Sequence, residues 1–233
     1  MIRTRICDLL GIAHPIVLGG MGTATTAPLV AAVSNAGGFG TLGTSAFNAA
    51  TLDTEIASIR ERTGKPFGIN HLLFQIQEEM FTVTLGAKPT VAAFAWARKD
   101  QDLHAYFQRA HDAGAKVMYM AGEVTEATRA AEAGADVIVA QGTEAGGHVG
   151  WMASLPLVPM MVKAVAPLPV LCAGGIADVD LDGPGGMEHR HDVVQDAGWS
   201  VQACARRKQL SHPHEMHAHG SIRSTVRGAD EGS

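Results

Sequence analysis

Seven short apolar runs recur through the first 178 residues of the chain. Each run is rich in Val, Ile, Leu or Phe and is flanked by Gly or Pro. Runs of this length and composition predict strands that are buried on both faces of a parallel sheet. They cover residues 15–18, 38–42, 66–69, 91–96, 116–120, 136–140 and 169–173.

Longer amphipathic stretches lie between these runs and have the periodicity of helices. The predicted helices cover residues 26–36, 52–62, 102–113, 124–133 and 157–165. Glycines follow several of them, where a left-handed cap costs least. Strands that alternate with helices predict an α/β fold with a parallel sheet. Because one more strand–helix unit would make eight, we expect a TIM-type (β/α)8 barrel that is incomplete, with about seven strands.

The alternation ends near residue 178. The last 55 residues, 179–233, hold only ten of Val, Ile, Leu and Met but six of the 11 histidines. Such a composition buries too little apolar surface to offset the entropy of ordering the chain. We therefore expect two parts: a barrel over residues 1–178, and an atypical, His-rich, disordered tail over residues 179–233.

Composition and charge narrow the class of protein. Hydrophobic residues make up 46% of the chain and the net charge is −5, which argues against nucleic acid or an anionic membrane as the main partner. No apolar run reaches the ~20 residues that span a bilayer, and the N-terminus lacks the apolar core of a signal peptide. The three cysteines are too scattered for a disulfide framework or a zinc finger. We expect a cytoplasmic protein without a metal site; the oligomeric state stays open.

Two glycine-rich segments directly follow predicted strands. Gly19-Gly20-Met21-Gly22 follows the first strand, where bare backbone lets a planar ligand approach closely. Gly174-Gly175 follows the seventh strand, where backbone N–H groups can bind an anion, as in the phosphate sites of barrels. A simple tight turn is the alternative for each segment.

A third segment, QGTEAGGH, follows the sixth predicted strand and runs from Gln141 to His148. It places an amide, a carboxylate and an imidazole at the same strand end. Because imidazole titrates near neutral pH, His148 suits the abstraction of a proton from a weak carbon acid. Glu144 either positions a ligand or is an ordinary loop carboxylate, and Trp96 and Trp151 either line a substrate pocket or simply pack.

These segments, with others in the same order, resemble the nitronate monooxygenase family. The matching stretches are PIVLGGMG, NAGGFGTLG, PFGINHLL, VIVAQGTEAGGHVG and PVLCAGGIAD. Together they cover about residues 5–178. The resemblance implies an FMN-dependent enzyme that oxidises alkyl nitronates with oxygen to a carbonyl compound and nitrite.

The resemblance also implies which residues bind the cofactor and which act on the substrate. His148 would be the catalytic base, or would orient the nitronate over the flavin. The flavin-binding positions would be Gly20, Met21, Asn70, Gln141, Gly146, Gly147, Gly174 and Gly175. Of these, the last two would bind the FMN phosphate. Asn70 would hydrogen-bond the flavin or its ribityl chain, and Gln141 would contact the isoalloxazine ring.

The family pattern breaks after the GGIAD segment. Members continue with an Ala- and Leu-rich helix and a second phosphate loop, whereas this chain reads VDLDGPGGMEHRH. We interpret the break as a frameshift near codon 178, which translation of the other two frames would test. Without the second phosphate loop we expect FMN to bind weakly. Two alternatives stay open: an FMN-dependent enoyl-acyl-carrier-protein reductase, and an inactive, truncated remnant of such an enzyme.

Overall fold

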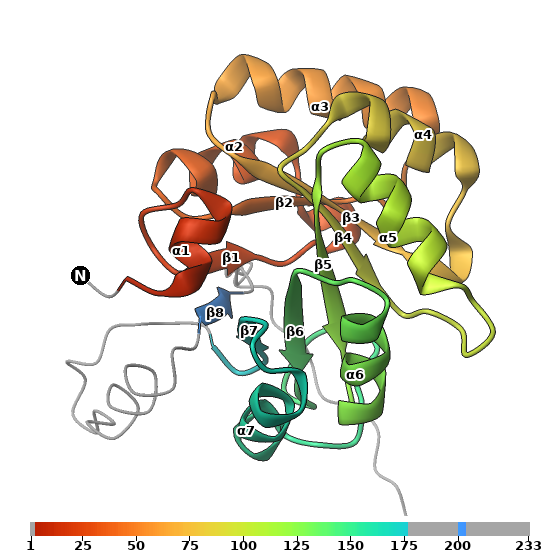
Figure 1. Ribbon diagram of the computed structural model, residues 1–233. Helices are drawn as coiled ribbons and strands as arrows, with labels where there is room; N and C mark the ends of the chain where they lie inside the picture. Colours follow the sequence, from red (N-terminus) through yellow and green to blue (C-terminus); the bar gives the residue numbers. More distant parts are fainter. Residues whose placement is uncertain (1–2, 177–199, 204–233) are drawn as a thin grey trace, which may run out of the picture.

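The computed structural model describes residues 3–176 and 200–203 of the chain. Its strands form one parallel sheet of eight, in the order β1-β8-β7-β6-β5-β4-β3-β2 (Figure 1). The strands are β1 (Ile16–Leu18), β2 (Gly40–Gly43), β3 (Phe67–Leu72), β4 (Val91–Ala95), β5 (Lys116–Ala121), β6 (Val137–Gln141), β7 (Val170–Ala173) and β8 (Ser200–Ala203). All seven predicted strands are therefore present.

The sheet curls until β1 and β2, the strands at its two ends, meet. Val17 of β1 bridges Phe39, which directly precedes β2, in parallel register. The Leu18 N–H donates to the Phe39 carbonyl at 2.8 Å, and the Phe39 N–H donates to the Ile16 carbonyl at 2.9 Å. The ring is thus the TIM-type barrel that the alternating pattern predicts.

The count of about seven strands needs correction, because β8 supplies an eighth. It pairs in parallel with β7 on one side and with β1 on the other. Its sequence, SVQA, has a single branched apolar residue, so the apolar pattern did not reveal it. Residues 200–203 belong to the barrel rather than to the tail. The predicted boundary at residue 178 and the rest of the tail lie outside the described residues.

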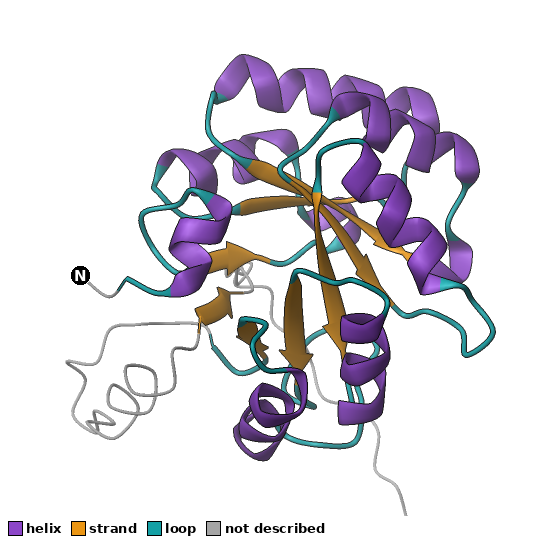
Figure 2. Ribbon diagram, in the orientation of Figure 1, coloured by secondary structure: helices purple, strands orange, loops and turns teal. Residues whose placement is uncertain are grey.

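Helices cover the outside of the ring (Figure 2). They are α2 (Ala27–Asn35), α3 (Ala49–Arg62), α4 (Glu78–Ala87), α5 (Leu103–Asp112), α6 (Val124–Glu132) and α7 (Ser154–Val165), with 3-10 turns η1 (Gly22–Ala24) and η2 (Leu73–Gln75). A further helix, α1 (Arg5–Leu10), packs against the inner core of the barrel. The sequence pattern missed α1 and α4. The first has only six residues, and the second contains β-branched residues and a glycine, which are weak helix formers.

The apolar core has an inner and an outer part. Inside the ring, Val17, Phe39, Val139 and Leu171 pack with neighbouring strand residues, and α1 adds Ile6, Cys7 and Leu10 to the same cluster. Outside, two clusters fill the space between the sheet and the helices, one over β1–β3 and one over β4–β7. The strands are therefore buried on both faces, which is why they read as continuous apolar runs.

Candidate active site

The segments that the sequence singles out lie at one end of the barrel. Because all eight strands are parallel, the loops that follow β1, β3, β6 and β7 emerge at the same edge of the ring. The predicted residues occupy these strand ends and loops: Gly20, Met21, Asn70, Gln141, Gly146, Gly147, His148, Gly174 and Gly175. The topology thus brings the predicted site residues to one face of the molecule.

Gly20 and Asn70 form one side of this barrel mouth. A Cβ added at Gly20 would lie 2.6 Å from the Asn70 Cβ, so only glycine fits there. Asn70 is 8% exposed, and its carboxamide makes no hydrogen bond within the described residues. Next to it, the Met21 N–H donates to the Thr25 hydroxyl at 3.4 Å. A buried amide without a protein partner is expected where a polar ligand binds.

Gln141 forms the opposite side, at the end of β6. Its side chain is 4% exposed, and its Nε2 donates to the Gly146 carbonyl at 3.1 Å. This bond folds the β6 loop back over the barrel and leaves the amide oxygen of Gln141 available. Gly147 has a φ of 81°, a conformation that a side chain at this point of the turn would strain.

His148 lies exposed at the tip of this loop and is held by two aromatic rings. Its imidazole lies 4.8 Å from the Trp96 ring and 6.2 Å from the Phe74 ring, centroid to centroid. The two aromatic residues are joined to each other, because the Phe74 N–H donates to the Trp96 carbonyl at 3.0 Å. Within the described residues, no carboxylate or hydroxyl bonds the imidazole.

Trp96 adopts a backbone conformation that is costly for a bulky residue. Its φ is 64°, in the left-handed region, which costs roughly 1–3 kcal/mol. The next residue, Ala97, is held by a core side chain, because its N–H donates to the Tyr119 hydroxyl at 3.3 Å. Such strain persists only where the surroundings impose it, and here it aims the indole at His148.

Tyr119 connects this strand end to α6. Its hydroxyl donates to the Glu126 carboxylate at 2.8 Å, and the same carboxylate accepts the Gly122 N–H at 3.0 Å. Burial raises the pKa of Tyr119, and the nearby Glu126 charge adds to the shift. Burial also raises the pKa of Glu126, although its two hydrogen bonds oppose that shift. The network fixes the loops after β4 and β5 against each other.

Gly174 and Gly175 follow β7 with φ values of 124° and 69°, in the left-handed region that favours glycine. A Cβ at Gly174 would lie 2.7 Å from the Ser154 hydroxyl and 3.0 Å from the Ala145 N. The β7 loop therefore lies directly against the β6 loop and the start of α7. Tight glycine turns of this kind can expose backbone N–H groups, and the anion site at this loop stays a prediction.

Glu144 binds the first residue of α7 rather than pointing into the barrel mouth. Its carboxylate accepts the Ser154 N–H at 2.9 Å and the Ser154 hydroxyl at 3.0 Å. Burial alone would raise the pKa of Glu144, but the hydrogen bonds from Ser154, together with those from Thr143 and its own N–H, lower it. The sequence left open whether Glu144 positions a ligand or is an ordinary loop carboxylate; in the structure it is a loop carboxylate that caps α7.

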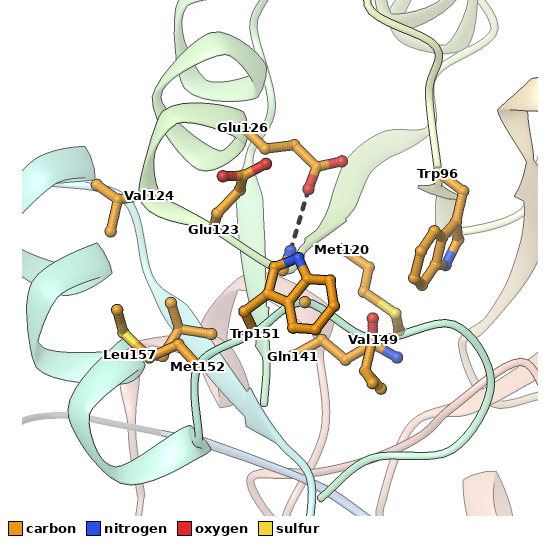
Figure 3. Close-up of a pocket in the computed structure, with 12 residues that line it drawn as sticks. Trp96, Met120, Glu123, Val124, Glu126, Gln141, Val149, Trp151, Met152 and Leu157 are labelled. Carbon is orange, nitrogen blue, oxygen red and sulfur yellow. Dashed lines mark hydrogen bonds between the residues drawn. The ribbon is translucent and has the colours of Figure 1, made fainter. Parts of the chain in front are cut away.

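A pocket of about 340 Å³ opens beside His148, between the loops that follow β4, β5 and β6. Its walls include both candidate tryptophans, Trp96 and Trp151, with Met120 and Met152 (Figure 3). Gln141 and Val149, the neighbour of His148, line it as well. Both tryptophans thus line a pocket, whereas the sequence left this open. No sequence pattern pointed to Phe74 or Tyr119.

Most of the barrel matches a known protein family. The family model for nitronate monooxygenase matches residues 3–83 and 76–181, which is most of the barrel. The chain belongs to the nitronate monooxygenase family. The family predicted from the QGTEAGGH segment and its companions is thereby confirmed.

Proteins with similar sequences are named for different activities. A 5-hydroxy-7a-methyl-1-oxo-octahydro-1H-indene-4-carboxyl-CoA dehydrogenase of Mycobacterium tuberculosis is 37% identical over 180 residues, covering 76% of this chain and 50% of that protein. A probable nitronate monooxygenase of Staphylococcus aureus is 32% identical over 222 residues, covering 76% of this chain and 61% of that protein. The chain thus spans about half to three fifths of the length of these curated relatives.

Solved structures give the same picture for the fold. FabK from Thermotoga maritima superposes with a TM-score of 0.76 at 34% identity, covering 88% of this chain and 62% of that one. Nitroalkane oxidase from Streptomyces ansochromogenes superposes with a TM-score of 0.72 at 26% identity, covering 85% and 66%. In the part of the chain that the structure describes, no helix combines the length and apolarity needed to cross a membrane.

Proposed function

We propose that this protein is an FMN-dependent oxidoreductase that oxidises alkyl nitronates with oxygen to a carbonyl compound and nitrite. The observation that carries the proposal is the position of His148. It lies exposed between Trp96 and Phe74 and beside an apolar pocket, at the same barrel mouth as the Gly20–Asn70 contact. Family membership and the likeness to a nitroalkane oxidase support the same chemistry.

The residues at the barrel mouth fit a flavin. Gly20 leaves no room for a side chain beside Asn70, whose buried carboxamide has its hydrogen-bonding groups unused among the described residues. Gln141 offers an amide oxygen across the mouth, and Gly146 and Gly147 leave their part of the β6 loop without side chains. Gly174 and Gly175 would bind the phosphate. Bound there, FMN would supply the redox chemistry that amino-acid side chains lack.

The protein's own residues would handle the proton and the substrate. His148 would take the proton from the carbon beside the nitro group, or would orient a nitronate that is already deprotonated. Trp96 and Phe74 would hold the imidazole in place. The apolar walls of the pocket would bind the alkyl part of the substrate and keep water from it.

A direct test measures oxygen uptake and nitrite release with ethyl nitronate, on protein purified with FMN added. We expect both, together with a flavin absorbance spectrum in the protein loaded with FMN. Nitrite release without added enzyme is the blank. Bound flavin without any nitronate-dependent oxygen uptake would reject the proposed reaction while keeping the cofactor.

A second candidate is an FMN-dependent enoyl-acyl-carrier-protein reductase. The observation that favours it is the likeness to FabK, which has the higher TM-score and identity of the two structures compared above. This reaction needs NADH or NADPH, so the oxidation of NADH with a crotonyl thioester separates the two candidates.

An inactive remnant is the third candidate, and a thermal melt without a cooperative transition would identify it. The cytoplasmic location and the absence of a resident metal stay predictions.

A further inference from the structure

The peptide group between Trp96 and Ala97 is hydrogen-bonded at both of its ends. Its carbonyl accepts the Phe74 N–H at 3.0 Å, and its N–H donates to the Tyr119 hydroxyl at 3.3 Å. This peptide directly follows the tryptophan that has the positive φ of 64°. Trp96 therefore cannot relax to an extended conformation unless the chain breaks at least one of these two bonds.

Tyr119 reaches this peptide from the core of the protein. Its side chain is 0% exposed, and its ring lies 5.9 Å from the Phe107 ring, centroid to centroid. Because its hydroxyl donates its only proton to Glu126 at 2.8 Å, the lone pairs of the same oxygen accept the Ala97 N–H. Burial raises the pKa of Tyr119, so the hydroxyl keeps the proton that it donates.

Glu126 holds the Tyr119 hydroxyl in turn. One oxygen of its carboxylate accepts from Tyr119, and the other accepts the Gly122 N–H at 3.0 Å (Figure 3). The bonds therefore run in one direction, from Ala97 through Tyr119 to Glu126, and each donor has its acceptor. At the loop end of this network, the imidazole of His148 lies 4.8 Å from the indole that the network fixes, centroid to centroid.

We propose that Tyr119 is a positioning residue for His148. Its hydroxyl holds the Trp96–Ala97 peptide, this peptide holds the indole, and the indole holds the imidazole at the barrel mouth. The inference rests on the proposed function, in which His148 acts on the nitroalkane or the nitronate. Tyr119 is not among the described residues that line the pocket, so it acts on the reaction only through Trp96.

The kinetic test removes the hydroxyl alone. Tyr119→Phe keeps the buried ring and deletes the acceptor of the Ala97 N–H. With the full chain loaded with FMN, we expect kcat for a neutral nitroalkane to fall about two- to tenfold at nearly constant KM, the range for loss of the Trp96 ring contact. Tyr106→Phe is the matched control. It changes the chain's other tyrosine, which packs in an aromatic cluster and whose hydroxyl makes no hydrogen bond among the described residues.

A double-mutant cycle tests whether Tyr119 acts through Trp96. The indole is absent in the Trp96→Gly background, so Tyr119→Phe should lower kcat no further there. Equal losses in the two backgrounds would overturn the inference, because Tyr119 would then act by another route. A kcat that Tyr119→Phe leaves unchanged, or that Tyr119→Phe and Tyr106→Phe lower alike, would also overturn it.

A nuclear magnetic resonance measurement on the full chain, without substrate, separates this inference from the proposed reaction. The ring current of the Trp96 indole should displace the ring-proton resonances of His148, which His148→Gln identifies by their loss. Tyr119→Phe should move these resonances toward those of free histidine, and Tyr106→Phe should leave them in place. Glu126→Gln keeps one acceptor oxygen of two, so it should move them in the same direction by a smaller amount.

The two kinds of failure give different results. Resonances that move as expected, in a protein that oxidises no nitroalkane or nitronate, reject the reaction and support the positioning role. Resonances that stay in place in both Tyr119→Phe and Glu126→Gln, in a protein that is active, reject the positioning role alone. Melting curves on the same samples show whether each variant keeps its fold.

Discussion

His71 and His148 show how differently the barrel treats the same side chain. His71 is 2% exposed on β3, with Nδ1 3.2 Å from the Thr44 hydroxyl and Nε2 2.8 Å from the Thr84 hydroxyl. His148 is exposed, and the contacts described for its ring are with Trp96 and Phe74. The His71 imidazole has both nitrogens occupied by protein, whereas the His148 imidazole has no hydrogen bond from either nitrogen to the residues that the structure describes.

The hydrogen bonds around His71 even fix its tautomer. The Thr44 hydroxyl donates its only proton to the Asn70 carbonyl at 2.9 Å. Nδ1 of His71 must therefore carry the proton and donate it to Thr44, and Nε2 accepts from Thr84. Burial lowers the pKa of His71 to about 4, so it stays neutral at physiological pH. The comparison teaches that accessible nitrogens, rather than residue type, mark the candidate base.

The largest expected effect is on turnover at His148. His148→Ala should lower kcat with a neutral nitroalkane by about 100- to 10,000-fold, the range for the loss of a general base. A preformed nitronate needs no deprotonation and should lose much less. Steady-state oxygen uptake with both substrate forms measures this, with His104→Ala on the exposed face of α5 as control. An equal loss for the two forms would assign His148 to orientation instead.

At His71 the same substitution should affect stability instead of chemistry. His71→Ala removes a packed ring between Phe81 and Phe94 and leaves the buried Thr84 hydroxyl without its partner. We expect a loss of about 3 kcal/mol in the free energy of unfolding. Urea titration followed by circular dichroism gives this value, with His104→Ala again as control. A cost below about 0.5 kcal/mol would show that the site is not tightly packed.

Acid should destabilise the fold through protonation of the His71 imidazole. The unfolded chain binds a proton at His71 near pH 6.5, whereas the folded chain binds it only near pH 4. The stabilisation is therefore complete above pH 6.5 and is lost as the pH falls to 4, by roughly 3 kcal/mol at ~1.36 kcal/mol per pKa unit. Melting curves over this range should show the loss, and His71→Leu should flatten it. An unchanged slope in that variant would assign the loss to other groups.

A smaller effect is expected at the aromatic ring beside His148. Trp96→Gly relieves the positive φ but removes the ring contact with the imidazole. An aromatic contact contributes ~0.5–1.5 kcal/mol, so kcat should fall about two- to tenfold while thermal stability is kept. Trp96→Phe should retain most of the activity. Stopped-flow turnover and melting curves on the same samples distinguish a positioning role from a merely structural one.

The smallest effect concerns Glu144, which contacts the start of α7 on the far side of the β6 loop. Glu144→Ala removes the acceptor of the Ser154 N–H and hydroxyl. The loss of a cap costs ~1 kcal/mol, or a few degrees in Tm. Thermal melts measure it, and Glu132→Ala serves as control. A large fall in FMN affinity at unchanged Tm would show instead that Glu144 acts on the cofactor.

Much of the fold and part of the site could be predicted from the sequence. All seven predicted strands are present because strands buried on both faces leave a continuous apolar signature, as at residues 91–95. The glycine segments also revealed strand ends, since few other residues tolerate the backbone at Gly147 or Gly174. Phe74 and Tyr119 could not be found in this way, because their roles depend on contacts between separate loops.

The chain by itself determined which segments become strands and which residue types gather at their ends, since both follow from local patterns of burial and backbone freedom. The tertiary structure decided the rest. Residues 200–203 became the eighth strand because β1 and β7 offer unpaired backbone groups on both sides. His71 and His148 have opposite environments because His71 packs against α4, whereas His148 lies on a solvent-exposed loop beside Trp96. Segments distant in the sequence impose this difference.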